Sequence, residues 1–439
     1  MIPPDLEDHI QALAFTGFNS LPHTTLLRVT GVNTAWLAHV LPKISFGRAR
    51  QETGVQLLLT AAGLAALGAS PEQIRAMGRE FANGITSTPT SQRLGDSGPH
   101  APDTTWWTDR DHQAVLLFYG TSAEALAAPI AELTSGVRQV GQTQLRLPPH
   151  SREPFGFLDG ITRTRIARGN ADKGYAMPAG TFIFGLPDAS GSIADGGPMA
   201  RHGALVVLRE LSQDVQSFWR YWLQVADGDE TTAIRLAAKA VGRWPNGMPL
   251  LPGQVTEPAF DATQLDFGTF AHDPKGDGCP FGSHVRRANP REGLTESPEI
   301  SLQIAALHTI LRRGRVFGPA APPDWYPTPL RMHMADGTQS DAAAHRGLMF
   351  IGLCRDLRSQ FEFIVQNWLL APKFADLYNE VDPLLAHTGT QRSFTVPTGG
   401  FCKHLEGVGG WIRPHGGGYY LMPGREVLRQ LALSANPRT

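Results

Sequence analysis

Cysteine is scarce in this chain of 439 residues, which contains only three, Cys279, Cys354 and Cys402, far apart in the sequence. Three separated cysteines form neither a disulfide framework nor a thiolate metal cluster, and they are typical of a reducing compartment. The sequence also lacks the ~20 uninterrupted apolar residues of a membrane-spanning helix. Its first residues, MIPPDLEDHIQALAF, are acidic and have no long apolar core, unlike a secretory signal. We therefore expect a cytoplasmic protein without a membrane partner.

An excess of charge of either sign is also missing. Lys and Arg total 39 and Asp and Glu total 40, which gives a formal net charge of −1. Without a basic field, nucleic acid is not an expected partner. Hydrophobic residues make up 41% of the chain and charged residues 18%, a composition that favours globular cores over disorder.

Strand-like and helix-like stretches alternate in short succession along the chain. In the first part, residues 54–60, 112–120 and 137–147 have strand patterns, and Ser70-Pro-Glu-Gln73 is a capping box that predicts the start of a helix. The polar segment 87–105 is predicted to be a surface loop. Since no long series of βαβ units is present, two α+β domains are the simplest interpretation, at residues 1–175 and 176–439.

The second part has the same mixed pattern. Its predicted strands and helices, in chain order, are strands at 180–186 and 203–211, helices at 229–242 and 298–313, a strand at 348–353, a helix at 357–370, a strand hairpin at 411–421 and a helix from Arg425. One stretch departs from this pattern, because residues 244–297 have almost no periodicity and are rich in Pro and Gly. Long irregular segments in compact domains are usually functional or disordered. Four aromatics here, Phe260, Phe267, Phe270 and Phe281, favour an ordered segment packed against a ligand.

The segment FGFLDGI at 155–161 contains the first candidate for chemistry. Asp159-Gly160 is a strong turn signal by itself, since both residues tolerate the backbone of a tight hairpin. The alternative is functional: Gly156 and Gly160 allow the backbone to approach a bound cofactor, and the Asp159 carboxylate can then move a proton.

A second candidate is His284, in CPFGSHVRRANPR. A histidine in an irregular, aromatic-rich segment can bind a metal through one ring nitrogen while the other is held by a partner. Any one of the 15 histidines can equally be structural, and His272 and His308 are the nearest competitors. The neighbouring arginines 286, 287 and 291 can pair with cofactor carboxylates or simply solubilise the loop. The common zinc, thiolate and phosphate-loop motifs are absent from the sequence.

The third candidate is the run HTILRRGRVFG at 308–318. Arginines in the last turn of a helix complement its dipole, and Gly314 is suited to a C-terminal cap, so a purely structural explanation is available.

Taken together and in this order, the three segments resemble the dye-decolorizing peroxidase family of haem enzymes. Gly156-Phe-Leu-Asp159-Gly160 matches the GxxDG signature of that family, and CPFGSHVRRANPR matches its proximal-histidine segment. ILRRGRVFG matches the segment of the distal arginine, and alignment of the trailing aromatic-Gly pair favours Arg312 over Arg313. Further blocks, such as GTFIFGLPD and RGLMFIGLCRDLRSQFEFIVQNW, extend the resemblance from about Phe18 to the C-terminus.

The resemblance implies a fold of two ferredoxin-like domains, each an antiparallel sheet flanked by helices. The GxxDG motif would lie in the N-terminal domain, and one haem b per chain would lie chiefly in the C-terminal one. His284 would be the iron ligand, with Glu362 accepting a hydrogen bond from its other ring nitrogen. The other implied cofactor contacts are Arg286, Arg312, Leu348 and Phe350.

The resemblance also implies an activity, the oxidation of dyes, phenols and similar small aromatic compounds by hydrogen peroxide. Asp159 would transfer the proton and Arg312 would stabilise developing negative charge, with best activity in acid. Bulky substrates could be oxidised at surface aromatics, with Trp368, Trp411, Tyr419 and Tyr420 as relays or as ordinary packed residues. Two alternatives stay open, a haem-handling protein with the same ligand and a haem-free binding module. The sequence leaves the oligomeric state open.

Overall fold

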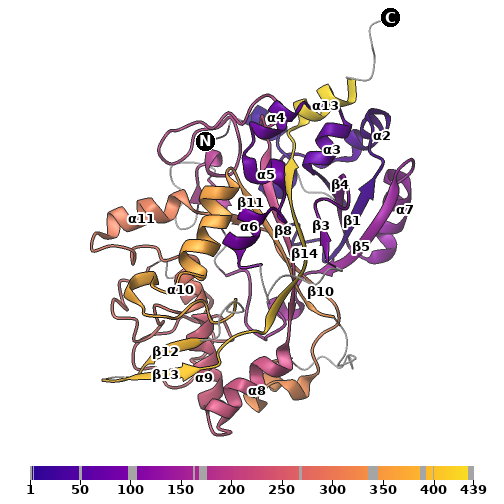
Figure 1. Cartoon of the computed structure of the whole chain (residues 1–439). Coiled ribbons are helices and arrows are strands. Elements are labelled where there is room, and N and C mark those ends of the chain that lie inside the picture. Colours follow the sequence, from indigo (N-terminus) through magenta and orange to yellow (C-terminus); the bar gives the residue numbers. More distant parts are fainter. Residues whose placement is uncertain are drawn as a thin grey trace, which may run out of the picture.

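The computed structural model describes residues 2, 4–48, 52–96, 106–161, 164–167, 176–265, 269–334, 345–385, 392–398 and 400–433. Its main sheet is built from two sets of strands with the same internal order (Figure 1). In the N-terminal set, β1 (His23–Thr30), β2 (Gly54–Leu59), β4 (Ala114–Gly120) and β5 (Arg138–Arg146) follow the order β5-β1-β4-β2. All three pairings in this set are antiparallel.

The C-terminal set repeats this arrangement. Its strands β8 (Ala204–Gln213), β9 (Leu311–Arg312), β11 (Gly347–Cys354) and β14 (Ile412–Met422) follow the order β14-β8-β11-β9, again antiparallel throughout. In both sets the first strand lies between the fourth and the third, and the second strand pairs with the third. This is the ferredoxin-like order, so the prediction of an α+β fold with two ferredoxin-like units is confirmed.

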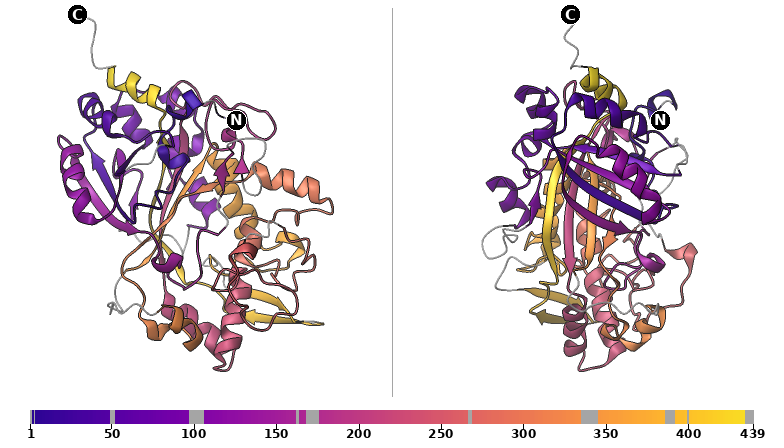
Figure 2. Two further views of the ribbon diagram at one scale, coloured as in Figure 1. Left: turned by 180° about the vertical axis from the view of Figure 1, so that it is seen from behind. Right: turned by 90° about the vertical axis from the view of Figure 1, so that its right-hand side faces the viewer.

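The two sets join at both ends. Leu421 of β14 pairs with Leu59 of β2, and β10 (Arg315–Phe317) pairs with both β5 and β11. Figure 2 shows β8, β11 and β14 side by side, crossed by the indigo and purple strands of the N-terminal set. Apolar side chains from both sets, such as Leu117, Val206 and Ile351, form one buried core. Because side chains alternate along a strand, the opposite face of β8 and β11 is left for helices and a cavity.

The helices begin and end where the local sequence provides caps. Asp214 caps α8 (Val215–Val225), and Asp229 caps α9 (Glu230–Val241), which ends at Gly242 in the left-handed conformation. Ser70 and Gln73 form the predicted capping box at the start of α4 (Pro71–Arg75). The segment after β11 consists of two π-helical stretches, η8 (Leu357–Phe361) and η9 (Ile364–Leu369). The shorter α10 (His284–Ala288) lies against η9.

The remaining elements are shorter or peripheral. The other α-helices are α1 (Pro4–Glu7), α2 (Thr34–Val40), α3 (Ala61–Ala66), α5 (Arg79–Asn83), α6 (Thr88–Leu94), α7 (Ala123–Leu133), α11 (Pro298–Leu307), α12 (Thr328–Met334) and α13 (Arg425–Leu433). The other strands are β3 (Trp107–Thr108), β6 (Arg165–Ile166), β7 (Ala176–Met177), β12 (Ser393–Pro397) and β13 (Cys402–Glu406). The 3-10 turns are η1 (Ala12–Ala14), η2 (Leu41–Lys43), η4 (Pro149–Ser151), η5 (Ala179–Thr181), η6 (Ala262–Gln264), η7 (Pro323–Trp325) and η10 (Phe374–Asp376).

Several predicted elements differ from the structure. Residues 180–186 form a 3-10 turn and irregular chain instead of a strand, because Phe182 and Ile183 are inserted fully into the core without ladder pairing. The predicted helix at 298–313 stops at Leu307; Arg312 belongs to β9 instead, and Arg313 lies between β9 and β10. Residues 412–422 form the single strand β14 and not a hairpin, because β8 pairs along its whole length.

Part of the polar segment 87–105 is helical. Residues 88–94 form α6, with Pro89 in its first turn, whereas 97–105 lie outside the described residues. The predicted domain boundary, after residue 175, also falls at the edge of residues outside the description. The boundary stays a prediction. We propose it because β1, β2, β4 and β5 all precede residue 175 and β8, β9, β11 and β14 all follow it. Over the described ranges, none of the helices combines the length and the apolar character that crossing a membrane requires.

Candidate functional site

A cavity of about 370 Å³ lies between the C-terminal strands and the helices beside them. Strands β8, β11 and β9 supply one wall, α10 and η9 supply another, and the turn at 153–161 lies at its rim. Five of the predicted site residues line this cavity, namely Asp159, His284, Arg312, Leu348 and Phe350. The folded chain therefore brings together side chains that are up to 191 positions apart, from Asp159 to Phe350.

His284 is the first residue of α10, and its ring is tied to a carboxylate. Nδ1 of His284 donates to Oδ2 of Asp382 over 2.8 Å, and the side chain of His284 is 29% exposed, whereas that of Asp382 is fully buried. With Nδ1 engaged, Nε2 is the nitrogen that can serve as a ligand toward the cavity. A carboxylate partner fixes the tautomer of an imidazole and makes it a stronger electron donor to a metal.

The surroundings of Asp382 keep its carboxylate charged. Its other oxygen, Oδ1, accepts hydrogen bonds from the backbone amides of Leu384 and Leu385, both at 2.9 Å. Burial opposes ionisation, yet the neighbouring His284, the Leu385 amide and the Arg287 guanidinium hold the pKa of Asp382 below its ordinary value. The carboxylate is thus a fixed acceptor for the His284 ring.

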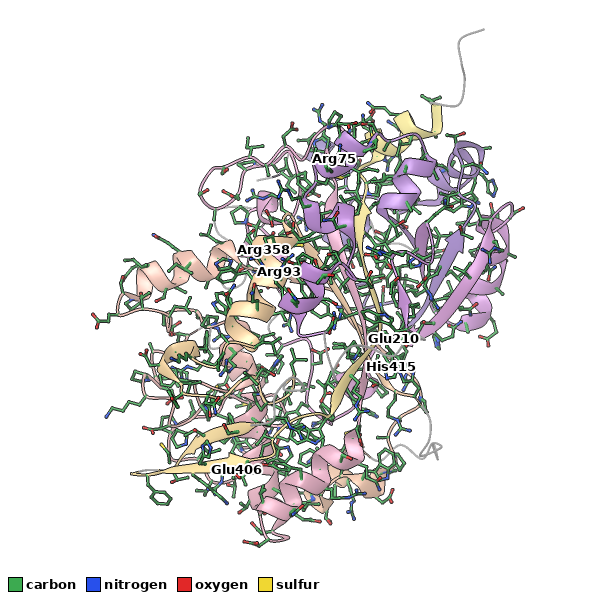
Figure 3. All side chains as sticks on the ribbon, in the orientation of Figure 1. Arg75, Arg93, Glu210, Arg358, Glu406 and His415 are labelled. Carbon is green, nitrogen blue, oxygen red and sulfur yellow. The ribbon has the colours of Figure 1, made fainter. Side chains whose placement is uncertain are left out.

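The prediction that Glu362 is this acceptor is wrong. Glu362 is fully buried, but its Oε1 accepts from the hydroxyls of Thr90 at 3.1 Å and Tyr419 at 2.9 Å, and its Oε2 is bonded to Nε of Arg93. Figure 3 shows Arg93 and Arg358, the two arginines near Glu362, close together on α6 and η8. Glu362 is on the side of the π-helical segment that packs on α6, so it ties the N-terminal half to this segment.

The predicted contact of Arg286 with a cofactor also finds no support, because its side chain is turned into the loop before α10. Its Nη1 donates to the carbonyls of Asp273 at 3.0 Å and Cys279 at 2.8 Å. The guanidinium lies over the rings of Phe270 and Phe281, at 4.6 and 4.2 Å. These contacts order the irregular segment before His284. Phe267 of the same segment lies outside the described residues, and Phe260 is exposed.

Arg287 holds the histidine-bearing helix to the segment that carries Asp382. It is fully buried and donates to the carbonyls of Trp368 at 2.7 Å, Ala371 at 3.0 Å and Glu380 at 2.8 Å. Carbonyls at the end of a helix have no intrahelical partner, so one planar cation with several donors satisfies them well. The 368–380 segment is thereby fixed beside α10.

Asp159 follows a turn that backbone hydrogen bonds close tightly. Its amide donates to Ser151 O at 2.6 Å, its Oδ1 accepts from the amide of Gly160 at 2.6 Å, and the side chain is partly buried at the cavity. Gly156 has a positive φ of 97°, and a Cβ there would lie 2.9 Å from a Leu330 methyl. Glycine is thus required at 156 both for the backbone conformation and for close packing.

The two adjacent arginines point in different directions. Arg312 lines the cavity. Arg313 donates through Nε to Leu13 O at 2.9 Å and through Nη2 to Ala14 O at 3.0 Å, on the opposite side. Successive side chains of an extended segment face opposite ways, which explains the difference. The geometry favours Arg312 over Arg313 as the cation of the cavity.

The rest of the lining suits a large, mostly apolar group that carries acidic substituents. Apolar side chains such as Leu348, Phe350, Ile364 and Leu384 dominate the walls, and Arg243 and Arg291 supply positive charge besides Arg312. Arg209 also lines the cavity, but both of its terminal nitrogens are paired with the buried carboxylate of Asp96. Over the ranges that the structure describes, no group of three or more His, Cys, Asp and Glu side chains is arranged to hold a metal ion. A single histidine such as His284 suits a haem iron, because the porphyrin supplies the other nitrogen ligands.

The competing histidines are less suited to this role. His308 also lines the cavity, but its Nδ1 is bonded to the carbonyl of Ser359 and not to a carboxylate, and its ring stacks on Phe363 at 3.6 Å. His272 is exposed. The four aromatics considered as surface relays, Trp368, Trp411, Tyr419 and Tyr420, are all buried, with at most 5% of each exposed. They are therefore not surface residues.

Sequence reasoning missed several residues of the site, among them Asp382, Leu94 and Glu153. Asp382 has no motif around it, and only its position in space reveals it. Leu94 of α6 lines the cavity. The sequence predicts a surface loop there, because the segment 87–105 is mostly polar. Glu153 lines the cavity close to the GxxDG turn, and its place six residues before Asp159 was the one available signal.

The known proteins that resemble this chain in sequence or in fold are peroxidases. No model of a known protein family matches the chain. Peroxidase 2 of Mycetinis scorodonius is 26% identical over 369 residues, 78% of this chain and 67% of the relative. Dye-decolorizing peroxidase AauDyP1 of Auricularia auricula-judae is 26% identical over 322 residues, 66% of this chain but only 57% of the relative.

The solved structures extend the likeness to the whole fold. The DyP-type peroxidase of Anabaena sp. superimposes with a TM-score of 0.79 at 18% identity, and the match covers 97% of this chain and 95% of the other. At this identity the superposition shows a shared fold. The chain is therefore similar in sequence to dye-decolorizing peroxidases and has the fold of the solved ones.

Proposed function

We propose that the protein is a haem peroxidase that uses hydrogen peroxide to oxidise dyes, phenols and similar small aromatic compounds. One observation carries the proposal: a carboxylate-bound imidazole, an aspartate and an arginine line the same cavity. The first is suited to hold an iron, and the other two to handle a proton and a negative charge. The names of the sequence relatives support the same activity.

The cofactor of this proposal is one haem b per chain. His284 would bind the iron through Nε2, and Arg243 and Arg291 would face the propionates. When bound, the haem supplies the electrons that reduce peroxide and then withdraws them from the aromatic substrate. Leu348 and Phe350 of β11 would cover the macrocycle and exclude bulk water from the cavity.

Asp159 and Arg312 would perform the chemistry of the protein itself. Oδ1 of Asp159 is engaged by the Gly160 amide, so Oδ2 is the atom that would take a proton from one peroxide oxygen and return it to the departing one. The guanidinium of Arg312 would stabilise the negative charge that develops as the O–O bond breaks. Both roles need side chains fixed before the substrate arrives, and the closed turn at 151–160 fixes Asp159.

We further propose that the protein works in the cytoplasm. Its three cysteines are free, two of them buried and Cys402 exposed, which fits a reducing compartment. A haem-handling protein would use the same axial ligand, but Asp159 and Arg312 have no evident role in it.

The proposal can be tested with haem-loaded protein and three variants. We expect the wild type and Arg312→Leu to show the Soret absorption of bound haem, and His284→Ala to lose it. Asp159→Ala and Arg312→Leu should retain haem and lose about a hundredfold or more in the rate of reaction with peroxide. If wild-type protein binds haem but consumes no peroxide, the haem-handling alternative is favoured; if it binds no haem, the protein is a haem-free binding module.

A further inference from the structure

Glu153 is a second carboxyl group of the cavity that the mechanism above does not use. It is partly buried, and it lines the cavity together with Asp159. Carboxyl groups are seldom placed in such a position without compensation. The question is what a second acid beside Asp159 does there.

Three hydrogen bonds hold the Glu153 carboxylate. Oε2 accepts from Nε2 of Gln213 at 2.7 Å and from the amide of Phe155 at 3.0 Å, while Oε1 accepts from the amide of Phe157 at 3.0 Å. The backbone of Glu153 adds two hydrogen bonds across the same turn. Its amide donates to the carbonyl of Phe157 at 3.0 Å, and its carbonyl accepts from the amide of Gly156 at 2.8 Å. Glu153 thus closes the turn that leads directly into Asp159.

The burial of Glu153 and the charges near it bring its pKa close to neutral pH. Burial, opposed by the three donors and reinforced by the charge of Asp159, raises the pKa of Glu153 to about 7. The other ionisable groups whose charges interact with it are Arg152, its chain neighbour, and Tyr326, whose hydroxyl donates to Pro154 O. Glu153 is therefore neutral in acid and charged in mild alkali.

We propose that Glu153 is a proton-holding positioning residue of the cavity, which acts on peroxide cleavage by holding the turn of Asp159 and by its own charge. In the neutral form it holds the turn without adding charge to the cavity. In the ionised form it adds a second negative charge to the same wall, and the negative charge that develops on the departing oxygen becomes less stable. The inference rests on the proposed function and adds to it a built-in limit on alkaline activity.

The expected kinetic signature is asymmetric. In the haem-loaded wild type, kcat/KM for peroxide should fall about tenfold as the pH rises through about 7, the size expected for one added charge at an effective dielectric of about 20. Glu153→Gln should lose this alkaline fall and keep the acid side of the profile, because glutamine is neutral throughout. A purely structural role would instead lower the rate by the same factor at every pH.

An infrared titration gives a readout independent of turnover. The carboxylic acid C=O band of Glu153 should be present in acid, disappear as the pH passes about 7, and be missing from Glu153→Gln at all pH values. Gln213→Met removes one donor to the ionised form, so the midpoints of the band and of the alkaline fall should both move to higher pH. This second variant tests the proposal even if Glu153→Gln fails to fold.

Glu257 provides a matched control. Its pKa is also raised, mainly by burial, and it accepts a hydrogen bond from the Asn246 amide at 2.7 Å, but it is not one of the cavity-lining residues. Glu257→Gln should leave the rate profile unchanged. The proposal is overturned if Glu153→Gln retains the alkaline fall, or if no band titrates near neutrality. Failure of the wild type to consume peroxide would overturn the proposed function itself, with the infrared result still reporting on Glu153.

Discussion

Nδ1 of His284 lies 2.8 Å from Oδ2 of Asp382, although the two residues are 98 positions apart in the chain. The carboxylate is fully buried, and the two backbone amides on its other oxygen leave it little freedom to move. An imidazole held in this way is oriented toward the cavity and enriched in electron density. This pair sets the proximal side of the proposed haem site.

Replacing Asp382 should change the properties of the iron more than its binding. We expect Asp382→Asn to retain haem through His284 and to raise the ferric/ferrous potential by about 60 mV, a tenfold change in the relative stability of the two states. A redox titration of both proteins measures the shift. Glu362→Gln is the matched control, since this equally buried carboxylate is bonded to Arg93, Thr90 and Tyr419 instead. A shift in the control and none in Asp382→Asn would contradict the assignment.

The adjacent arginines 312 and 313 should give opposite phenotypes. Arg312→Leu should lose about a hundredfold or more in the rate with peroxide and retain its stability, because it lines the cavity. Arg313→Leu should lose about 1–3 kcal/mol of unfolding free energy, since its bonds to Leu13 O and Ala14 O hold the N-terminal segment. Stopped-flow kinetics and chemical denaturation of both variants separate the two effects. Equal loss of rate in both variants would argue against Arg312 as the cavity cation.

His112 should make the protein less stable in acid. Its ring is 2% exposed and Nε2 pairs with the Tyr420 hydroxyl at 2.9 Å; burial, followed by the charge of Arg28, lowers its pKa to about 4. Below pH 6.5 the unfolded chain binds a proton here that the folded chain does not bind until about pH 4. Stability should therefore fall by about 3 kcal/mol as the pH decreases through this window.

Chemical denaturation of haem-free protein at a series of pH values tests this contribution, with His112→Gln as the comparison. The difference in unfolding free energy between the two proteins should vary with pH between about 4 and 6.5 and be constant above it. A difference that stays constant across the window would show that His112 does not titrate as expected.

Arg287 should be needed for stability. It is fully buried and donates to the carbonyls of Trp368, Ala371 and Glu380, so Arg287→Met leaves several buried acceptors without a donor. We expect a loss of at least about 3 kcal/mol in unfolding free energy and weaker retention of haem, because α10 and the segment before Asp382 are no longer held together. Thermal unfolding and haem transfer to a competing apoprotein measure the two effects. Unchanged stability would mean that water replaces the guanidinium.

Local sequence patterns were sufficient for much of the fold. The capping box at Ser70, the alternating residues of β5 and the Asp229-to-Gly242 helix were all predicted, because each signal lies within one element. The strand predicted at 180–186 was wrong, since an apolar run indicates burial but does not say whether a neighbouring strand is available for pairing. For the same reason, the pattern at 411–421 predicts a hairpin, whereas the structure has the single strand β14.

The sequence by itself determined which side chains are available to the cavity: His284 in its irregular segment, Asp159 in the GxxDG turn, and a pair of arginines before Gly314. These choices are local, because the residue types and their close neighbours define them. Only the tertiary structure decided that Asp382 and not Glu362 holds the imidazole, that Arg312 and not Arg313 lines the cavity, and that Glu153 joins Asp159 there. Those outcomes depend on packing between distant segments and on which face of a strand a side chain occupies. A short stretch of sequence determines neither.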